Sequence, residues 1–164
     1  MCIRDRRIAN SKVNRKGQAG FTLLELMLIL TVAAILAMIA IPSYQAYVVR
    51  AQNAAATADI GQIEMLVSRY APQHNGELPP DLSTIGMDAK LDPWGHPYYY
   101  HTTFEGTGNG VGRKDKGLHP INTDYDLYSS GPDGKSVAPL TAKPSQDDII
   151  RANDGSYVGV AANY

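Results

Sequence analysis

The chain has 164 residues, enough for one domain and a long helix but too few for two substantial hydrophobic cores. Its formal net charge of -1 hides an asymmetry, because six of the 15 basic residues but only one of the 16 acidic residues precede Phe21. The remainder is therefore acidic, which argues against nucleic-acid binding, since no basic patch remains outside the first 20 residues. The only cysteine is Cys2, so the rest of the chain cannot form an internal disulfide.

A basic head precedes an apolar segment. Residues 1–20 are polar and basic, and the 21 residues from Phe21 to Ile41 carry one charge, that of Glu25. At about 1.5 Å per residue, a helix of this length spans roughly the 30 Å hydrocarbon layer of a bilayer. The charge asymmetry predicts a cytoplasmic leader and an exported body. Residues 1–6 resemble the translation of a sequencing-library adapter, and on this hypothesis we assign no chemistry to Cys2.

The segment after the apolar run is amphipathic at helical spacing. It extends from Ser43 to Tyr70, and Pro72 and Asn75-Gly76 are expected to end it. We therefore predict one helix of about 50 residues, apolar on all sides in its first half and on one side in its second. The predicted apolar stripe of the second half comprises Ala51, Ala55, Ala58, Ile63, Leu66, Val67 and Tyr70.

The remaining residues alternate between short apolar runs and turn signals. Strands are predicted at Tyr98–Thr103 and Asp124–Ser130, with a third candidate at Ser156–Val160. A helical turn is predicted at Leu82–Ile85 and a turn at Asp92–Pro97. Residues 104–123 and the region from Lys135 onward are predicted to be largely loop. The expected fold class is α+β: a long N-terminal helix packed on a small antiparallel sheet, with a long C-terminal loop region.

The junction between leader and helix carries the strongest motif. The sequence Lys16-Gly17-Gln18-Ala19-Gly20-Phe21-Thr22-Leu23-Leu24-Glu25 resembles the class III signal of type IV pilins and pseudopilins. The resemblance implies cleavage by the prepilin peptidase after Gly20 and methylation of the new amine of Phe21. An ordinary secretory signal is the alternative, but it is cut after its apolar run, and no Ala-x-Ala site precedes Pro42. We therefore expect a leader (residues 1–20), a transmembrane and filament-core helix (21–41) and a soluble pilin-like domain (42–164).

Glu25 lies within the apolar run. A carboxylate inside a membrane helix costs roughly 2.5–3.5 kcal/mol on insertion, which predicts a partner, and a plain single-pass anchor supplies none. In the pilin family the glutamate at the fifth position after the cut pairs with the amino terminus of a neighbouring subunit, so the resemblance implies a role for Glu25 in assembly. Pro42 also matches a proline of the family; without the resemblance it predicts only a kink at the membrane edge.

Two motifs in the soluble part resemble those of the major, G-type pseudopilin of type II secretion. They are Asp92-Pro93-Trp94-Gly95-His96-Pro97-Tyr98 and D-Y-D-L-Y-S-S-G-P-D-G at residues 124–134. The resemblance implies a non-enzymatic subunit in the bacterial inner membrane with its domain in the periplasm. It also implies a helical homopolymer with minor pseudopilins, built on an inner-membrane assembly platform and driving protein secretion.

Two alternatives remain open. A true type IV pilin, major or minor, would form a surface filament for adhesion, motility or DNA uptake, and the longer loops favour it. A monomeric, membrane-anchored binding domain would use Trp94 and Tyr98–Tyr100 as its surface, but Glu25 argues against it, and we predict core and subunit contacts for these aromatic residues. No nucleophile, base and acid set is discernible, so no catalysis is predicted, and the spacing of the histidines does not indicate a zinc site.

The resemblance further implies a calcium ion that holds the C-terminal loops. The implied ligands are the carboxylates of Asp133, Asp147 and Asp148 and the backbone carbonyl of Ser130. Calcium prefers oxygen ligands from carboxylates, carbonyls and water, and a metal would replace the missing disulfide. Asp and Gly also form turns without any metal. Because the loops are longer than those of the family, Asp154 is a further candidate ligand.

Overall fold

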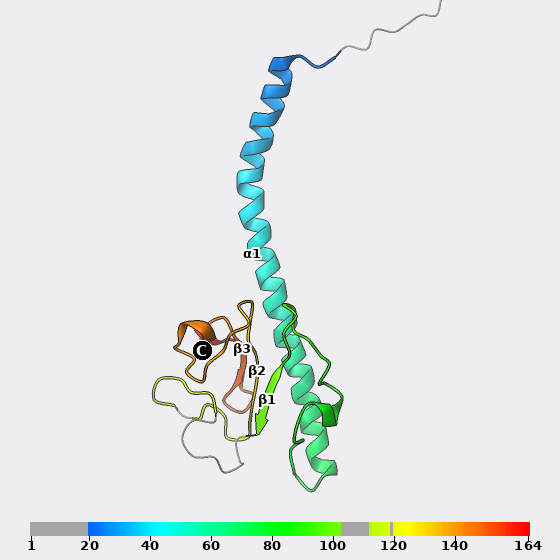
Figure 1. Ribbon diagram of the computed structural model, residues 1–164, viewed down its shortest axis with the longest axis vertical. Helices are drawn as coiled ribbons and strands as arrows, with labels where there is room; N and C mark the ends of the chain where they lie inside the picture. The colour runs from blue at the N-terminus through cyan, green and yellow to red at the C-terminus, as the bar shows by residue number, and fades with distance from the viewer. Residues whose placement is uncertain (1–19, 103–111, 119) are drawn as a thin grey trace, which may run out of the picture. The chain divides into compact units, whose positions relative to one another are not determined.

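The computed structural model describes residues 20–102, 112–118 and 120–164 (Figure 1). The chain divides into two units, Met1–Pro42 and Ser43–Tyr164. Within the described residues it forms one α-helix, α1 (Leu23–Tyr70), and four strands: β1 (Tyr99–Thr102), β2 (Tyr125–Ser129), β3 (Ile149–Ala152) and β4 (Tyr157–Val160). The expected α+β fold is confirmed. Most of the predicted leader, and residues 104–111 and 119 of the predicted loop at 104–123, lie outside the described residues.

Helix α1 begins at a side-chain cap. The hydroxyl of Thr22 accepts a hydrogen bond from the backbone N–H of Glu25 at 3.2 Å, and the carbonyl of Thr22 accepts one from the N–H of Leu26 at 3.1 Å. Glu25 in the first turn also suits the positive end of the helix dipole. From Phe21 to Ile41 the side chains are exposed and nearly all apolar, and the helix is long and apolar enough to cross a membrane.

The second half of α1 supplies one wall of the core in the second unit. Its buried residues are Ala56, Ile60, Ile63 and Val67. Their spacing of four, three and four residues places them on one face of the helix. The predicted stripe was wrong at Ala51, Ala55 and Ala58, which are exposed. Alanines occupy most positions between 51 and 58, so the sequence there offers too little contrast to fix which face is buried.

The end of α1 follows the predicted stop signals. The helix ends at Tyr70 and continues as a 3₁₀ turn over Ala71–Gln73. The N–H of Gly76 then donates to the carbonyl of Ala71 at 2.8 Å, and both Asn75 and Gly76 adopt positive φ angles. Glycine and asparagine tolerate this conformation better than other residues.

The four strands form one antiparallel sheet in the order β1-β2-β3-β4. The predicted strands correspond to β1, β2 and β4, but β3 lies in a region predicted as loop. Strand β3 has only four residues, and all of them are buried. Such a strand shows no alternation of polar and apolar residues, which removes the usual sequence signal.

Apolar residues cover both faces of the sheet. On one face the buried stripe of α1 packs with Leu82, Tyr98, Tyr125, Leu127 and Ile149. On the other, strand β3 and the surrounding loops form a second cluster made of Ile121, Leu140, Ile150, Ala152 and Ala161. The adjacent residues Ile149 and Ile150 therefore point to opposite faces, as strand geometry requires. Loops, and not a second helix, thus cover this face of the sheet.

Candidate functional site

The residues predicted to be processed lie before helix α1. A Cβ atom on Gly20 would meet nothing within 4 Å among the described residues, and the side chain of Phe21 is 70% exposed. The peptide bond between Gly20 and Phe21 is therefore accessible in this structure. Cleavage at this bond and methylation of Phe21 stay predictions.

The two residues predicted to act in assembly belong to the first unit. Glu25 is exposed, and no ion pair to it forms among the described residues. Helix α1 continues through Pro42, which has no N–H to donate to the carbonyl of Met38 one turn earlier. The helix is therefore weakest in backbone hydrogen bonding at this point. The assembly roles of Glu25 and Pro42 stay predictions.

The two motifs of the soluble part form one hydrogen-bonded unit. The hydroxyl of Ser129 at the end of β2 donates to Asp92 Oδ2 at 2.5 Å, and both side chains are buried. The other oxygen of Asp92 accepts from the N–H groups of Trp94 (3.0 Å) and His96 (2.8 Å) and so closes the turn. His96 Nδ1 lies 3.0 Å from the carbonyl oxygen of Gly131. The Asp92–Pro97 turn therefore fixes the start of the loop that follows β2.

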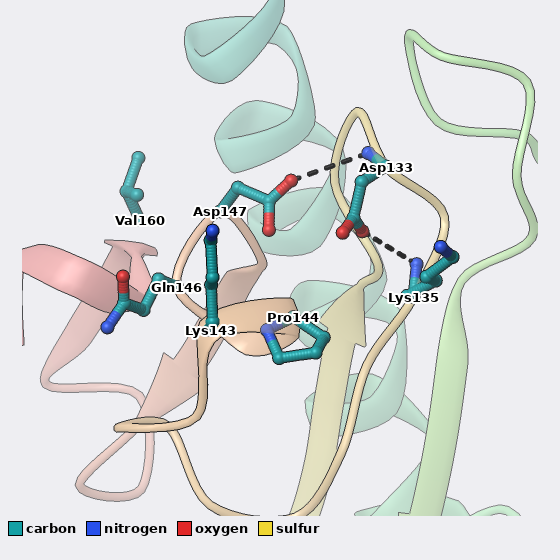
Figure 2. Close-up of a pocket in the computed structure, with 7 residues that line it drawn as sticks. All are labelled: Asp133, Lys135, Lys143, Pro144, Gln146, Asp147 and Val160. Carbon is teal, nitrogen blue, oxygen red and sulfur yellow. Dashed lines mark hydrogen bonds between the residues drawn. The ribbon is translucent and has the colours of Figure 1, made fainter.

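An open pocket of about 540 Å³ lies beside that loop (Figure 2). It is lined by Asp133, Lys135, Lys143, Pro144, Gln146, Asp147 and Val160. The carboxylate of Asp147 accepts from the N–H of Asp133 at 3.4 Å, so the two acidic residues lie on facing segments. Gly131 has a φ of 63°, and a Cβ there would clash with the carbonyl oxygen of Asp147. The turn and the segment before β3 therefore approach closely only because residue 131 is glycine.

The oxygen atoms of this pocket fit calcium in part. Asp133 and Asp147 supply two carboxylates, whereas Ser130, the predicted carbonyl ligand, is not among the residues that line the pocket. Lys135 and Lys143 line the same pocket, and their positive charges would repel a calcium ion. Over residues 20–102, 112–118 and 120–164, no group of three or more histidine, cysteine, aspartate or glutamate side chains is placed to hold a metal. Calcium binding stays a prediction.

The predicted ligand Asp148 has a different environment. Its side chain is fully buried, and its Oδ2 accepts hydrogen bonds from the guanidinium of Arg113 and from the hydroxyl of Ser136, the latter at 2.6 Å. Its Oδ1 has no hydrogen-bond partner among the described residues. Burial raises the pKa of Asp148 to about 6, although Ser136 and Arg113 act to lower it. Asp148 does not line the pocket that holds Asp133 and Asp147.

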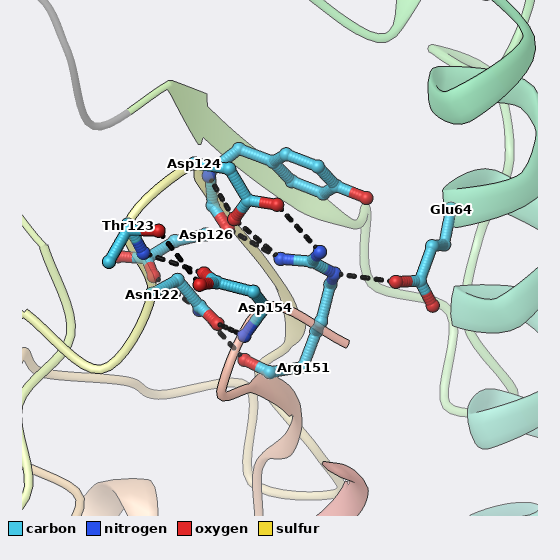
Figure 3. Close-up of polar contacts among 8 residues, drawn as sticks. Glu64, Asn122, Thr123, Asp124, Asp126, Arg151 and Asp154 are labelled. Carbon is cyan, nitrogen blue, oxygen red and sulfur yellow. Dashed lines mark hydrogen bonds and ion pairs between the residues drawn. The ribbon is translucent and has the colours of Figure 1, made fainter. Parts of the chain in front are cut away.

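A second buried arginine joins the sheet to helix α1 (Figure 3). Arg151 on β3 donates from Nε to Glu64 at 2.9 Å and from both terminal nitrogens to Asp124, at 2.8 and 2.7 Å. Its guanidinium lies 4.0 Å above the ring of Tyr125. Burial alone would lower the pKa of Arg151, but the hydrogen bonds to Asp124 and Glu64 raise it above its ordinary value. Arg151 therefore remains charged and paired.

The further candidate ligand Asp154 ties two loops together (Figure 3). Its two oxygens accept from the N–H and the hydroxyl of Thr123, each at 2.7 Å, and its own N–H donates to the side-chain oxygen of Asn122 at 3.0 Å. The hydrogen bonds from Thr123 lower the pKa of Asp154. Both carboxylate oxygens are thus engaged in holding the turn before β4.

The aromatic residues contribute to the core, as predicted. Tyr98 is buried, Trp94 and Tyr100 pack against the first core cluster, and Tyr99 stacks on Tyr128 with ring centroids 5.1 Å apart. Their predicted role in subunit contact is untested. The sequence reasoning missed the two buried arginines, Arg113 and Arg151. Recognition of β3 would have found Arg151, because it alternates with Ile150 and so lies on the face of Ile149.

Comparison with known proteins gives consistent matches. A family model described as the prokaryotic N-terminal methylation motif matches residues 15–41. The fimbrial proteins of Neisseria meningitidis serogroups A and B are 31% and 39% identical over 152 residues, covering 89% of this chain and 86% of each relative. The type II secretion system core protein G of Pseudomonas aeruginosa is 30% identical over 144 residues, covering 75% of this chain and 89% of the relative. No solved structure matches the chain.

Proposed function

The chain belongs to the family of type IV pilins and type II secretion pseudopilins, and we propose that it is the structural subunit of a type II secretion pseudopilus. Members of this family polymerise into filaments after processing by the prepilin peptidase. In this proposal the precursor spans the inner membrane with its leader in the cytoplasm and its domain in the periplasm. The activity of the protein is assembly and not catalysis.

Processing creates the charge that assembly needs. Cleavage after Gly20 frees the amine of Phe21, which the same peptidase methylates without removing its positive charge. Among apolar helices this ammonium and the carboxylate of Glu25 are each costly alone, and pairing between neighbouring subunits removes both penalties. The exposure of Glu25 on α1, without an ion pair among the described residues, supports such an intermolecular partner.

The filament core consists of the apolar segments of many copies. Large exposed side chains occupy the segment from Phe21 to Ile41 in the single chain. Packing each segment against its neighbours replaces lipid contacts by close side-chain contacts, which add up to a large dispersion energy. The missing hydrogen bond at Pro42 gives the helix a point where it can adjust when a subunit leaves the bilayer.

The observation that favours the pseudopilus is the hydrogen bond between Ser129 and Asp92 at 2.5 Å. It joins the two motifs that resemble the G-type pseudopilin, so these motifs act as one structural unit and not as two chance matches. The similarity to protein G, over 89% of that relative, also supports the proposal. The second candidate, a surface pilus, is favoured by the two fimbrial relatives, which match a larger share of this chain.

We further propose that calcium binds in the pocket beside the Gly131–Gly134 turn. Asp133 and Asp147 would contribute their carboxylates and Ser130 its carbonyl oxygen. Asp148 is omitted from this set because Arg113 and Ser136 hold its Oδ2. Saturation at a hundred times the dissociation constant would stabilise the domain by about 2.7 kcal/mol. Unfolding of the wild type and of Asp147→Asn, each with calcium and with chelator, tests this; an equal response of both proteins rules the site out.

Expression of this chain in place of known subunits distinguishes a pseudopilus subunit from a subunit of a surface pilus. The chain should be expressed in a bacterium whose G-type pseudopilin gene is deleted, and in a second strain that lacks its major pilin gene. We expect restored release of a secreted enzyme into the medium of the first strain and no surface pili on the second. Surface pili without restored secretion would identify the protein as a pilin. A Glu25→Val variant, produced at equal level, controls for effects that do not require assembly.

A further inference from the structure

Arg113 and Asp148 form an ion pair inside the protein. Their side chains are 4% and 0% exposed, and they lie 35 residues apart in the chain. A terminal nitrogen of Arg113 donates to Asp148 Oδ2, and the other donates to the hydroxyl of Ser136 at 2.5 Å. That hydroxyl in turn donates to the same oxygen of Asp148 at 2.6 Å. The three side chains therefore close a ring of charge-assisted hydrogen bonds in which Arg113 and Asp148 are buried and Ser136 is half-buried.

Arg113 also fixes the segment that carries it. Its backbone N–H donates to Asp126 Oδ2 at 2.6 Å, and its guanidinium lies 4.2 Å above the ring of Tyr128. The next residue, Lys114, donates from its N–H to the carbonyl of Ala138 at 3.0 Å and accepts from the N–H of Leu140 at 2.8 Å. Arg113 therefore links β2 and the loop at residues 136–140 to the start of β3.

A calcium ion bound to Asp148 would also link these segments, because ligands from several loops would share one cation. We propose that Arg113 is a built-in cation that replaces calcium at Asp148 and keeps divalent cations away from this carboxylate. A guanidinium and a divalent ion at one buried carboxylate repel each other more strongly than they would in bulk water. Arg113 is absent from the lining of the Asp133 and Asp147 pocket, so the inference is independent of the calcium proposed there. The inference about Arg113 also holds whether the protein forms a pseudopilus or a surface pilus.

The test compares unfolding of the full chain in detergent micelles, in EGTA and in millimolar calcium chloride. Trp94, the only tryptophan, packs against the core and reports the transition by its fluorescence. The measured quantity is the shift in melting temperature on adding calcium, and the wild-type shift is the baseline. Comparison with the wild-type shift subtracts any change in melting temperature that calcium causes by binding in the Asp133 and Asp147 pocket. Magnesium chloride at the same concentration controls for ionic strength.

We expect Arg113→Gln to melt roughly 10 °C below the wild type in EGTA, because an unpaired buried carboxylate remains. Calcium should then restore most of this loss, since Asp148 becomes free to bind it. Arg113→Gln combined with Asp148→Asn should show only the wild-type shift, and so should Arg113→Lys, which keeps a cation. A calcium shift in Arg113→Gln equal to that of the wild type overturns the proposal, as does a gain in Arg113→Lys.

Arg113→Gln has a second readout for the case that it does not fold in EGTA. The variant is then refolded from urea, once in EGTA and once in calcium. Recovery of the native Trp94 fluorescence in calcium alone supports the proposal, because the added cation then does what Arg113 did. Recovery in neither condition overturns it, since Asp148 would not have become a calcium site.

Discussion

Arg151 on β3 donates from Nε to Glu64 on helix α1 at 2.9 Å, across 87 residues of sequence. The arginine side chain is 4% exposed, and it is the buried cation between Glu64 and Asp124. With the only cysteine at position 2, this ion pair takes the place that a disulfide would have between helix and sheet. The pair connects the second half of α1 to the sheet within the second unit.

Loss of the Arg151 cation is expected to destabilise the second unit. Arg151→Met removes the guanidinium that Glu64 and Asp124 share, and removal of one member of a buried pair costs about 3–5 kcal/mol. Urea unfolding followed by Trp94 fluorescence measures the free energy. Lys135→Met, outside the network, is the control and should unfold like the wild type. A loss below about 1 kcal/mol would show that water, and not Arg151, compensates the carboxylates.

The buried stripe of α1 predicts that substitutions at Ile63 and Met65 change the free energy of unfolding by very different amounts. Ile63 is 1% exposed in the first core cluster, whereas Met65 is 68% exposed on the same helix. Ile63→Ala should lower the free energy of unfolding by about 2–5 kcal/mol, because it leaves a cavity in the core. Met65→Ala should change it by less than about 0.5 kcal/mol in the monomer. Equal effects of the two substitutions would place the helix in a different orientation on the sheet.

The helix of the first unit was predictable because 21 consecutive residues with a single charge have few interpretations. The extent of α1 followed from the apolar run and its end from turn residues, and strands β1, β2 and β4 followed from short runs between turn signals. The ion pairs of Arg151 and Arg113 did not, because they join residues 87 and 35 positions apart. Such contacts depend on the register of β3, a four-residue strand buried on both faces, where no sequence period exists. From the sequence alone, calcium and metal-free turns of Asp and Gly were therefore the available explanations for the order of the C-terminal loops.

Asp154 predicts an acid-dependent loss of stability. The N–H and hydroxyl of Thr123 stabilise its charged form and lower its pKa in the folded state. The resulting stabilisation is present above the unfolded pKa of about 3.9 and is lost as the pH falls through the lower folded pKa. Asp154→Asn, which tolerates the positive φ at this position, should be less stable at pH 7 by under about 1 kcal/mol.

The difference between Asp154→Asn and the wild type should shrink as the pH falls below the unfolded pKa of about 3.9. Urea midpoints at several pH values measure it, and the exposed Asp88→Asn serves as the control. A constant difference down to pH 2 would mean that the charge of Asp154 contributes nothing.

Glu25 predicts a defect in assembly without a defect in insertion. Removal of this carboxylate lowers the cost of membrane insertion and leaves the ammonium of a neighbouring Phe21 unpaired in the filament. Glu25→Val should therefore remain in the membrane after alkaline extraction, while filaments in the sheared fraction fall at least tenfold. Glu77→Val, at an exposed position after α1, is the control. Normal filament yield from Glu25→Val would contradict the pairing of charges.

The central claim is that proteolysis frees Phe21 as the end of a polymerising helix. Mass spectrometry of the amino-terminal peptide, taken from protein in the filament fraction of a strain with an active prepilin peptidase, tests it most directly. We predict a peptide that begins at Phe21 and carries one added methyl group on its amine. A peptide that still contains Lys16–Gly20, with Phe21 internal, would contradict the account.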